Sequence, residues 1–286
     1  MSLSRADAYQ ACLDTLRSTD FDRYLACLLM PENKRGAVAA LYTFNAEIAR
    51  IRDVIREPLP GEIRLQWWRD VLEGTAEGDS LANPLAAGLL QVIAEYDLPR
   101  SPLLAMTDAR IFDLYDDPMG DTAMFEGYAG ETASTLIQLA ALILDPANAA
   151  RSAEAAGHAG VAQATAGCLM LMPIHIRRHQ VYIPATILQA TGLNAGAFID
   201  GADHDRCKAA IDAFVGLGRD HLASARAAAR GHVSPTLNLA FLGAALAEPV
   251  FDRAARAGAS LRERMVQPSQ LARQWRMWRA ARRGVF

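Results

Sequence analysis

The sequence has very little lysine, and this shortage shapes its charge. Lys34 and Lys208 are the only lysines, so nearly all of the 29 basic residues are arginines, set against 32 acidic residues. The resulting net charge of −3 excludes the basic field that general nucleic-acid binding requires. Arginine suits planar contacts to phosphate and carboxylate, although genome composition is the simpler explanation for such a bias.

Cysteine pairs, a secretory signal and long apolar runs are also missing. The four cysteines lie far apart, at Cys12, Cys27, Cys168 and Cys207. Because none forms a CxxC pair, we expect buried free thiols in a reducing compartment. Residues 1–10 lack the apolar core of a signal peptide, and no apolar run reaches about 18 residues, so we expect no secretion and no transmembrane helix. We therefore expect a cytoplasmic protein. The alternative is peripheral attachment at the inner face of the cytoplasmic membrane.

What the sequence does contain favours an all-α protein. Apolar residues make up 51% and charged residues 21% of 286 residues, which is enough for a full core. Alanine is abundant, β-branched runs are short, and proline and glycine fall mostly between periodic segments. Without an internal repeat or a long linker, residues 1–286 are expected to form one helical domain of ten or more helices.

Apolar periodicity, together with capping residues, proline and glycine, predicts the helix positions. The predicted helices span 5–17, 20–29, 31–53, 62–74, 84–96, 102–115, 122–144, 147–172, 205–229, 236–257 and 268–283, with a further one ending near 192. Pro173 is expected to end or kink the helix before it. Residues 57–61 are expected to form a turn, 74–83 and the stretch after 192 are expected to be loops, and the segment that starts at 179 is the one candidate for extended backbone.

The predicted helix from Pro31 to Asp53 is the element around which the others are organised. Pro31 and Glu32 are both favourable at a helix N-terminus. Apolar residues then recur at helical spacing, at Val38, Leu41, Tyr42, Phe44, Ile48 and Ile51. We expect one face of this helix to line a central cavity.

An acidic cluster spans the end of the helix predicted at 102–115 and the residues after it. Its members are Asp113, Asp116, Asp117 and Asp121. Carboxylates at such spacing can hold Mg²⁺. Pro118 and Gly120 instead favour a polar turn whose aspartates cap the next helix, and this is the interpretation we adopt.

A second cluster places His175 and His179 at i and i+4, beside Arg177 and Arg178. This spacing suits zinc, but no third ligand lies nearby. The adjacent arginines favour a basic segment that contacts an anion.

Two segments combine tryptophan with arginine. The C-terminal helix carries Trp275 and Trp278 together with Arg273, Arg276, Arg279, Arg282 and Arg283. Such a helix fits an anionic membrane surface, and it fits equally well a helix packed on the body of the fold with its arginines in solvent. In the second segment, Trp67-Trp68, we expect one indole to enter the core.

Several blocks of the sequence resemble the squalene/phytoene synthase family, whose typical forms are P..KR..ALYAFCR, YC..VAG, G.AxQLTNILRD and GRVYLP. The matching residues are Phe21, Pro31, Lys34-Arg35, Ala40 to Phe44, Arg64-Leu65, Trp68, Tyr128, Gly130, Gly160, Ala162 and Val181 to Pro184. They cover roughly residues 21–184. The resemblance implies the isoprenoid synthase fold, an all-α bundle of helices around a central cavity.

The resemblance also implies what the cavity would hold. In working members of the family, two aspartate-rich motifs on facing helices bind Mg²⁺ ions, which hold prenyl diphosphates and assist diphosphate departure. The first motif falls on Ala49, Arg50 and Asp53, and the second falls on Leu171, Ile174 and His175. Only Asp53 retains a carboxylate, and we expect it to pair with Arg50 or Arg56.

The residues in these blocks are similar to those of a narrower group of squalene/phytoene synthase-like proteins. The mitochondrial members of this group assist assembly of respiratory complex I. The resemblance therefore implies a non-catalytic or repurposed protein that binds an isoprenoid or lipid, uses no cofactor, and has a protein partner in respiratory-complex assembly. The alternative is an active, Mg²⁺-dependent transferase that joins two prenyl diphosphates head to head. Whether the chain is an enzyme stays open at this point.

In either case, ligand or diphosphate contacts are expected from residues on the two facing helices. They are Arg35, Tyr42, Asn45, Arg50, Asp53, His175 and Arg178, with Ile48 and Leu171 along an apolar tunnel.

Overall fold

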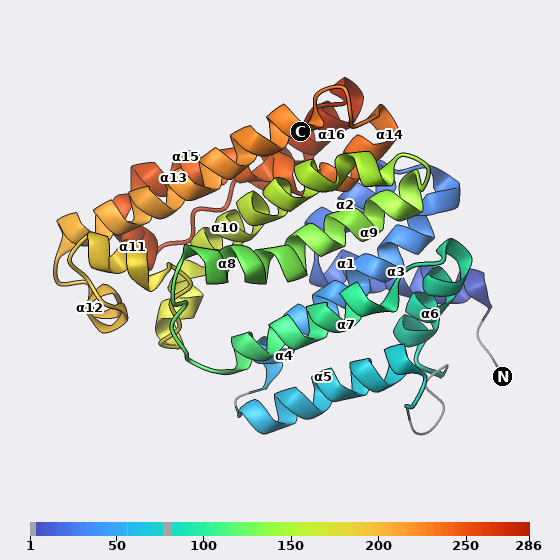
Figure 1. The fold of residues 1–286 in the computed structure, drawn as a ribbon, viewed down its shortest axis with the longest axis horizontal. Helices are drawn as coiled ribbons and strands as arrows, with labels where there is room; N and C mark the ends of the chain where they lie inside the picture. Colours follow the sequence, from blue (N-terminus) through green and yellow to red (C-terminus); the bar gives the residue numbers. More distant parts are fainter. Residues whose placement is uncertain (1–3, 56, 77–81) are drawn as a thin grey trace.

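The computed structural model describes residues 4–55, 57–76 and 82–286, and these form a bundle of helices (Figure 1). None of the described residues lies in a strand. The all-α prediction is confirmed, and the expected extended piece around residues 179–183 is irregular backbone without strand pairing.

The α-helices, labelled as in Figure 1, are α1 (Arg5–Thr19), α2 (Phe21–Leu28), α3 (Glu32–Ala49), α4 (Ile51–Val54), α5 (Pro58–Glu73), α6 (Pro84–Tyr96), α7 (Arg100–Ala109), α8 (Thr122–Ala129), α9 (Thr135–Leu144), α10 (Ala153–Arg177), α11 (Ala185–Ala190), α12 (Ala195–Asp200), α13 (His204–Ala229), α14 (Pro235–Asn238), α15 (Ala247–Ala257) and α16 (Gln270–Arg283). Short 3₁₀ turns occupy Arg110–Leu114, Ala149–Ser152, Leu239–Phe241, Ala244–Leu246 and Gly258–Arg262. A π-helical turn, Gly130–Ser134, joins α8 to α9.

Many helices begin at a side chain that accepts a hydrogen bond from a backbone N–H of the first turn. These caps are Ser4, Asp20, Asn83, Asp121, Asn194, Asp203, Ser234 and Ser269. Each cap satisfies a donor that the helix leaves unpaired, which explains why local sequence marks most helix starts. Asp121 capping α8 confirms the polar-turn interpretation for the end of the acidic cluster.

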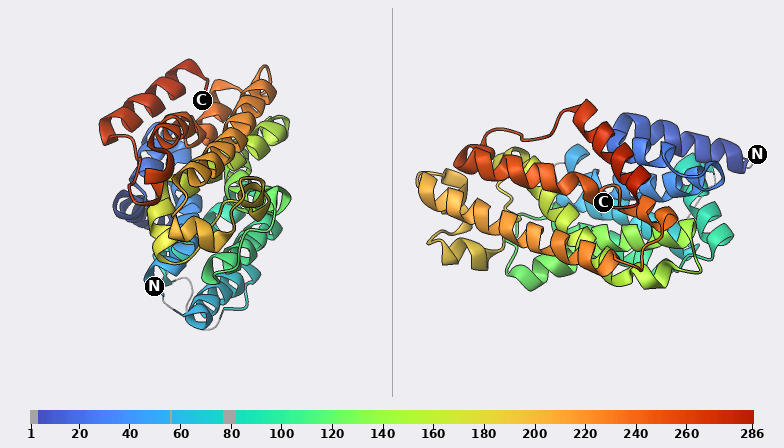
Figure 2. Two further views of the ribbon diagram at one scale, coloured as in Figure 1. Left: turned by 90° about the vertical axis from the view of Figure 1, so that its left-hand side faces the viewer. Right: turned by 90° about the horizontal axis from the view of Figure 1, so that it is seen from above.

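Two long helices organise the bundle. Every residue of α3 from Ala37 through Ala46 is buried, because α3 is surrounded by α1, α2, α6 and α9. On the other side, α10 packs against α13, α15 and α9. The N-terminal helices and the α10–α13–α15 group therefore form two halves, with α8 and α9 between them (Figures 1 and 2).

The predicted helix 31–53 is wrong at its C-terminal end, where two helices replace one. α3 ends at Ala49 and α4 begins at Ile51. Arg50, between the two helices, has φ −89° and ψ −2°. The break leaves Arg50 exposed while Ile51 is buried. The change of direction also brings Asp53 to the cavity described below.

Proline does not end helices where the sequence pattern suggests. α10 continues for one turn beyond the buried Pro173 to Arg177, so the predicted end near Met172 is wrong. A mid-helix proline costs about 3 kcal/mol. Residues 57–61 are likewise not a turn, since α5 begins at Pro58, where a proline is well tolerated.

Other boundaries differ because tertiary packing subdivides the periodic segments. The segment predicted as a helix at 102–115 is α7 followed by a 3₁₀ turn, and 236–257 is divided into α14, two 3₁₀ turns and α15. The stretch after 192, predicted as a loop, contains α12. The predicted loop 74–83 lies partly outside the described residues.

The remaining composition-based predictions have mixed outcomes. Trp68 is buried edge-on against Phe44 while Trp67 is half-buried, which confirms that one indole enters the core. All four cysteines are free thiols, three of them buried, and burial raises the pKa of Cys12 to about 12. One segment, Ala149–Arg177, is long and apolar enough to cross a membrane by length and composition, so the absence of a transmembrane helix stays a prediction. Half of its apolar window is buried inside the bundle, so core packing accounts for the same composition.

Candidate functional site

A cavity of about 400 Å³ lies between the two halves of the bundle. Its lining comes from α2, α3, α4, the α8–α9 segment, α10 and the C-terminal helices α15 and α16. This volume falls within the range of small-molecule sites. The central cavity expected from the sequence is therefore present.

Much of the cavity lining is apolar. The apolar residues include Leu136, Ile137, Ala164, Ala166, Met170, Leu171, Ala240, Leu246, Ala247, Val250 and Met277. Along α10 the lining passes from Arg178 and His175, at the helix end, to small and aliphatic residues toward its middle. Gly167 contributes open space there, since a Cβ atom built on it would meet nothing within 4 Å. Such a surface favours a hydrocarbon chain over a polar ligand.

The remaining lining is strongly charged but balanced. It contains the aspartates Asp20, Asp22, Asp53 and Asp113 and the arginines Arg23, Arg52, Arg110 and Arg178. Each of the four aspartates makes an ion pair with an arginine. The carboxylates are therefore already neutralised by the protein itself.

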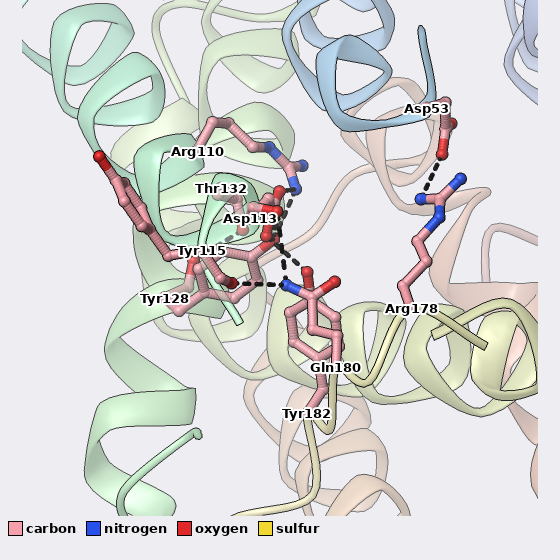
Figure 3. Close-up of polar contacts among 9 residues, drawn as sticks. All are labelled: Asp53, Arg110, Asp113, Tyr115, Tyr128, Thr132, Arg178, Gln180 and Tyr182. Carbon is pink, nitrogen blue, oxygen red and sulfur yellow. Dashed lines mark hydrogen bonds and ion pairs between the residues drawn. The ribbon is translucent and has the colours of Figure 1, made fainter. Parts of the chain in front are cut away.

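One of these pairs joins the two sides of the cavity. Arg178, just after α10, donates to the Asp53 carboxylate on α4 at 2.8 Å (Figure 3). Asp53 does not pair with Arg50 as expected, and Arg56 lies outside the described residues. Because the side chains of Asp53 and Arg178 are 50% and 30% exposed, solvent screens this pair.

A buried polar network surrounds Asp113. Its Oδ1 accepts hydrogen bonds from the Tyr182 hydroxyl at 2.7 Å and the Tyr128 hydroxyl at 2.8 Å, and its Oδ2 pairs with Arg110 at 2.9 Å (Figure 3). Gln180 donates to the backbone carbonyl of Asp113 at 3.5 Å. Burial raises the pKa of both tyrosines well above its ordinary value, so both hydroxyls stay protonated and donate.

The other two cavity aspartates, Asp20 and Asp22, pair with an arginine of α2 and an arginine of α16. Asp20 caps α2 and pairs with Arg23 at 2.5 Å. The oxygen of the Asn45 amide, in the orientation that suits its neighbours, accepts from Arg23 at 3.2 Å. Asp22 pairs with Arg273 of α16 at 2.9 Å, which ties the C-terminal helix to the cavity edge.

His175 faces the cavity as a neutral imidazole. Burial, with a smaller contribution from Arg178, lowers its pKa to about 4 against the opposing effects of Asp113 and Asp53. Its ring lies 4.7 Å from the Tyr182 ring, between the Asp113 network and the Asp53–Arg178 pair. At neutral pH it therefore adds no charge to the cavity.

The structure brings together most, but not all, of the residues predicted from the sequence. Tyr42, Asn45, Asp53, His175 and Arg178 all line the cavity, as does Leu171. Three others are not among its lining residues: Arg35, Arg50 and Ile48. Arg35 donates to backbone carbonyls of Cys27, Leu28 and Met30 near the end of α2, and Ile48 is buried in the core.

Sequence reasoning missed the centre of the polar network. The sequence pattern places Asp113 near the end of the helix predicted at 102–115, before a polar turn, but this residue lies in a 3₁₀ turn and is only 7% exposed. Tyr128 and Tyr182 stand in two of the blocks that carry the resemblance, so these blocks were the available signal for a functional role. The partners Arg110 and Gln180 carried no signal in the sequence. His179 is exposed and turns away from His175, and the predicted absence of a histidine zinc pair stays a prediction.

Comparison with known proteins places this cavity in a family. A family model described as squalene/phytoene synthase matches residues 16–278. The chain belongs to the squalene/phytoene synthase family. A ligand-bound dehydrosqualene synthase shares the fold, with a TM-score of 0.79 and 14% identity over 98% of this chain and 97% of that one. Squalene synthase HpnC from Alicyclobacillus acidocaldarius does too, with a TM-score of 0.73 and 17% identity over 89% of this chain and 95% of that one.

A curated relative points to a different role within the family. It is named NADH dehydrogenase (ubiquinone) complex I, assembly factor 6, from Homo sapiens, and is 31% identical over 188 residues. The match covers 66% of this chain but only 56% of the relative's length. The solved synthases establish the fold alone, because their sequence identity to this chain is so low.

The positions to which the family resemblance assigns metal-binding aspartates do face each other. Ala49 and Asp53 line the cavity from the α3–α4 side, and Leu171 and His175 line it from α10. Arg50 is directed away from it. In this squalene/phytoene synthase family member, these four cavity positions thus carry one carboxylate.

The residues present do not fit a magnesium cluster. Mg²⁺ prefers oxygen ligands, and holding several ions requires carboxylates that converge with unoccupied oxygens. Here each cavity aspartate is paired with an arginine, and no group of three or more His, Cys, Asp or Glu side chains in the described part of the chain is placed to hold a metal. An ion would have to displace an arginine from each carboxylate it used.

Proposed function

We propose that this protein is a repurposed family member that holds an isoprenoid or another lipid-like molecule in its cavity and serves respiratory-complex assembly without transferring prenyl groups. One observation carries the proposal: every carboxylate that lines the cavity is paired with an arginine, while much of the remaining lining is apolar. No cofactor is part of the proposal.

The physical reason lies in what diphosphate departure demands. The leaving group carries several negative charges, and hard cations held by carboxylates neutralise them as the carbon–oxygen bond breaks. Preorganised charge of this kind usually contributes more to such catalysis than any other effect. Paired aspartates supply no free ligands, whereas arginine can still contact an anionic headgroup directly. The ability to bind an amphiphilic molecule is therefore easier to retain than the ability to ionise a prenyl diphosphate.

The assembly role is supported by the names of the curated relatives. Proteins from Homo sapiens, Bos taurus and other organisms with this name are complex I assembly factors, at 31% identity for these two. We extend that role to this chain, with a respiratory-complex subunit or another assembly protein as its partner. The proposed location is the cytoplasmic side of the membrane that contains the complex, with peripheral contact through α16.

The first experiment separates binding from catalysis. Purified protein is incubated with farnesyl diphosphate in the presence and absence of Mg²⁺, and released diphosphate and hydrocarbon products are measured. We expect no diphosphate release above the protein-free blank under either condition. Mg²⁺-dependent release of diphosphate, together with a C30 product formed from two farnesyl groups, would instead establish the transferase alternative.

The second experiment fills the cavity without disturbing the fold. Gly167→Leu places a side chain into the open space on α10, and Gly216→Leu on α13 is the matched control, because its Cβ position is equally open but does not line the cavity. Both changes should raise helix stability by up to about 1 kcal/mol. We expect lipid retained through purification, extracted and measured by mass spectrometry, to be lost from Gly167→Leu and kept by Gly216→Leu. Equal retention in both variants would contradict a ligand in this cavity.

A further inference from the structure

The C-terminal helix α16 exposes its most apolar side chains. Met277 and Ala280 are buried against the bundle. On the opposite face, Leu271, Trp275 and Trp278 follow one another at i, i+4 and i+7 and are 77%, 60% and 40% exposed. A surface helix normally turns polar residues outward. This helix instead exposes large apolar side chains to solvent.

The two exposed indoles form one continuous surface. The rings of Trp275 and Trp278 stack with centroids 5.0 Å apart and an angle of 23° between their planes. The Arg282 guanidinium lies over the Trp278 ring at 5.2 Å. Together with Leu271, these side chains make a ridge with an apolar body and a cationic end.

Charge on the same helix is of one sign. α16 contains five arginines and no acidic residue, in a chain whose net charge is −3. Arg273 and Arg276 face inward, to Asp22 and to the carbonyl of Ala245. Arg279, Arg282 and Arg283 are exposed, and among the described residues none of these three makes an ion pair. Their charge is therefore available to an external anion.

The ridge also lies beside the cavity. Met277 lines the cavity, and Arg273 is paired at 2.9 Å with Asp22, another lining residue. One face of α16 is thus part of the cavity wall while the other faces outward at the edge of the molecule (Figure 2). A surface bound to the outer face would be separated from the cavity by about one helix.

We propose that the outer face of α16, formed by Leu271, Trp275, Trp278, Arg279, Arg282 and Arg283, docks on an anionic lipid bilayer. The indoles and Leu271 enter the interfacial region, where tryptophan is favoured, and the three arginines contact anionic headgroups. A single weak signal gives only marginal attachment, and here apolar area and charge act together. The docking specifies the peripheral contact through α16 that is part of the proposed function, but it does not require a ligand in the cavity. Uptake of a lipid-like ligand from the docked position does rest on the proposed function.

The test is sedimentation of the full chain with vesicles of neutral phosphatidylcholine or of phosphatidylcholine mixed with phosphatidylglycerol. We expect wild-type protein to bind the anionic vesicles, less at high salt, with a blue shift of its tryptophan fluorescence. Trp275→Ala/Trp278→Ala should weaken binding by about tenfold or more and abolish the shift. Arg279→Gln/Arg282→Gln/Arg283→Gln should weaken it by at least about tenfold and remove the salt dependence.

The matched control removes exposed apolar side chains from another face. Leu59→Ala/Ile63→Ala on α5 changes residues that are 66% and 62% exposed, at the opposite end of the molecule from α16 (Figures 1 and 2). It should bind vesicles like wild type. Failure of wild type to bind either vesicle, or unchanged binding by the tryptophan variant, would overturn the proposal and assign this surface to a protein partner or to solvent.

The cavity variant keeps this test separate from the proposed function. Gly167→Leu should bind anionic vesicles like wild type even though it retains no lipid. Loss of retained lipid is measured without vesicles, so absence of a cavity ligand would overturn the proposed function alone. Vesicle binding that disappeared in Gly167→Leu would contradict docking through α16.

Discussion

At the scale of single residues, the cavity is governed by how each charge is compensated. Asp113 is buried, and Arg110 and two tyrosine hydroxyls surround its carboxylate. Removing one partner of such a buried pair is far more costly than removing an exposed one. Asp53 and Arg178 are exposed enough to part when a ligand enters. Loss of this pair should therefore cost less stability than loss of the buried Asp113–Arg110 pair.

His175 makes stability depend on pH. Its folded pKa of about 4 lies below its ordinary value of 6.5, so as pH falls the unfolded chain gains a proton before the folded chain does. Stability contributed by the neutral ring is complete above about pH 6.5 and is lost as pH falls toward 4. The loss amounts to at most about 3 kcal/mol.

This dependence is measured by urea unfolding between pH 7 and pH 4.5. Carboxylates also titrate in this range, so the informative quantity is the difference between wild type and His175→Gln, which cannot titrate there. We expect the variant to lose less stability than wild type on acidification. Identical pH profiles would mean that His175 is not held neutral by burial.

At the scale of elements, α10 and the π-helical turn approach each other closely at Gly160. Gly160 of α10 lies against Ser134, and a Cβ atom there would be 2.1 Å from the Ser134 Oγ and 2.3 Å from its backbone nitrogen. The Ser134 hydroxyl donates to the carbonyl of Gly157 at 2.8 Å, which fixes the same crossing. This contact positions the α10 side of the cavity relative to Tyr128 and the Asp113 network.

Two glycines on α10 provide a matched pair of variants. Gly160→Ala should destabilise the protein by about 2 kcal/mol or more, since backbone atoms of Ser134 cannot move away cheaply. Gly157→Ala, one turn earlier, meets nothing within 4 Å and should stabilise the helix by up to about 1 kcal/mol. Chemical denaturation of both variants tests this. A neutral Gly160→Ala would show that the crossing is looser than described.

At the scale of the whole molecule, the fold is shared with solved synthases despite low sequence identity. The dehydrosqualene synthase aligns over nearly the full length of both chains at 14% identity. Packing of a helical bundle depends on the volume and pattern of apolar residues, so it tolerates extensive substitution. The proposed function therefore rests on the residues of the cavity, since one fold can host several activities.

The assembly role is testable in the organism that encodes the chain. Deleting the gene should reduce assembled complex I severalfold on native gels, together with NADH-dependent respiration. Restoring the gene with Gly216→Leu should recover both, whereas Gly167→Leu should not, because its cavity is filled. Undiminished complex I in the deletion strain would contradict an assembly role for this protein.

The sequence by itself determined the helices and the family. Capping residues such as Ser4 and Asp121, and the spacing of apolar residues, act within a turn or two of the chain, so they could be predicted. The blocks around Tyr42 and Tyr182 carried the resemblance for the same reason. Local sequence also placed Tyr42, Asn45 and His175 on the cavity correctly.

Only the tertiary structure decided how the charges are paired. Asp113 meets Tyr182 across 69 residues and Asp53 meets Arg178 across 125, and such partners depend on how whole helices pack. The break at Arg50 and the continuation of α10 past Pro173 were also not evident from local preference. Helix positions follow from short-range interactions, whereas the chemistry of this cavity follows from long-range ones.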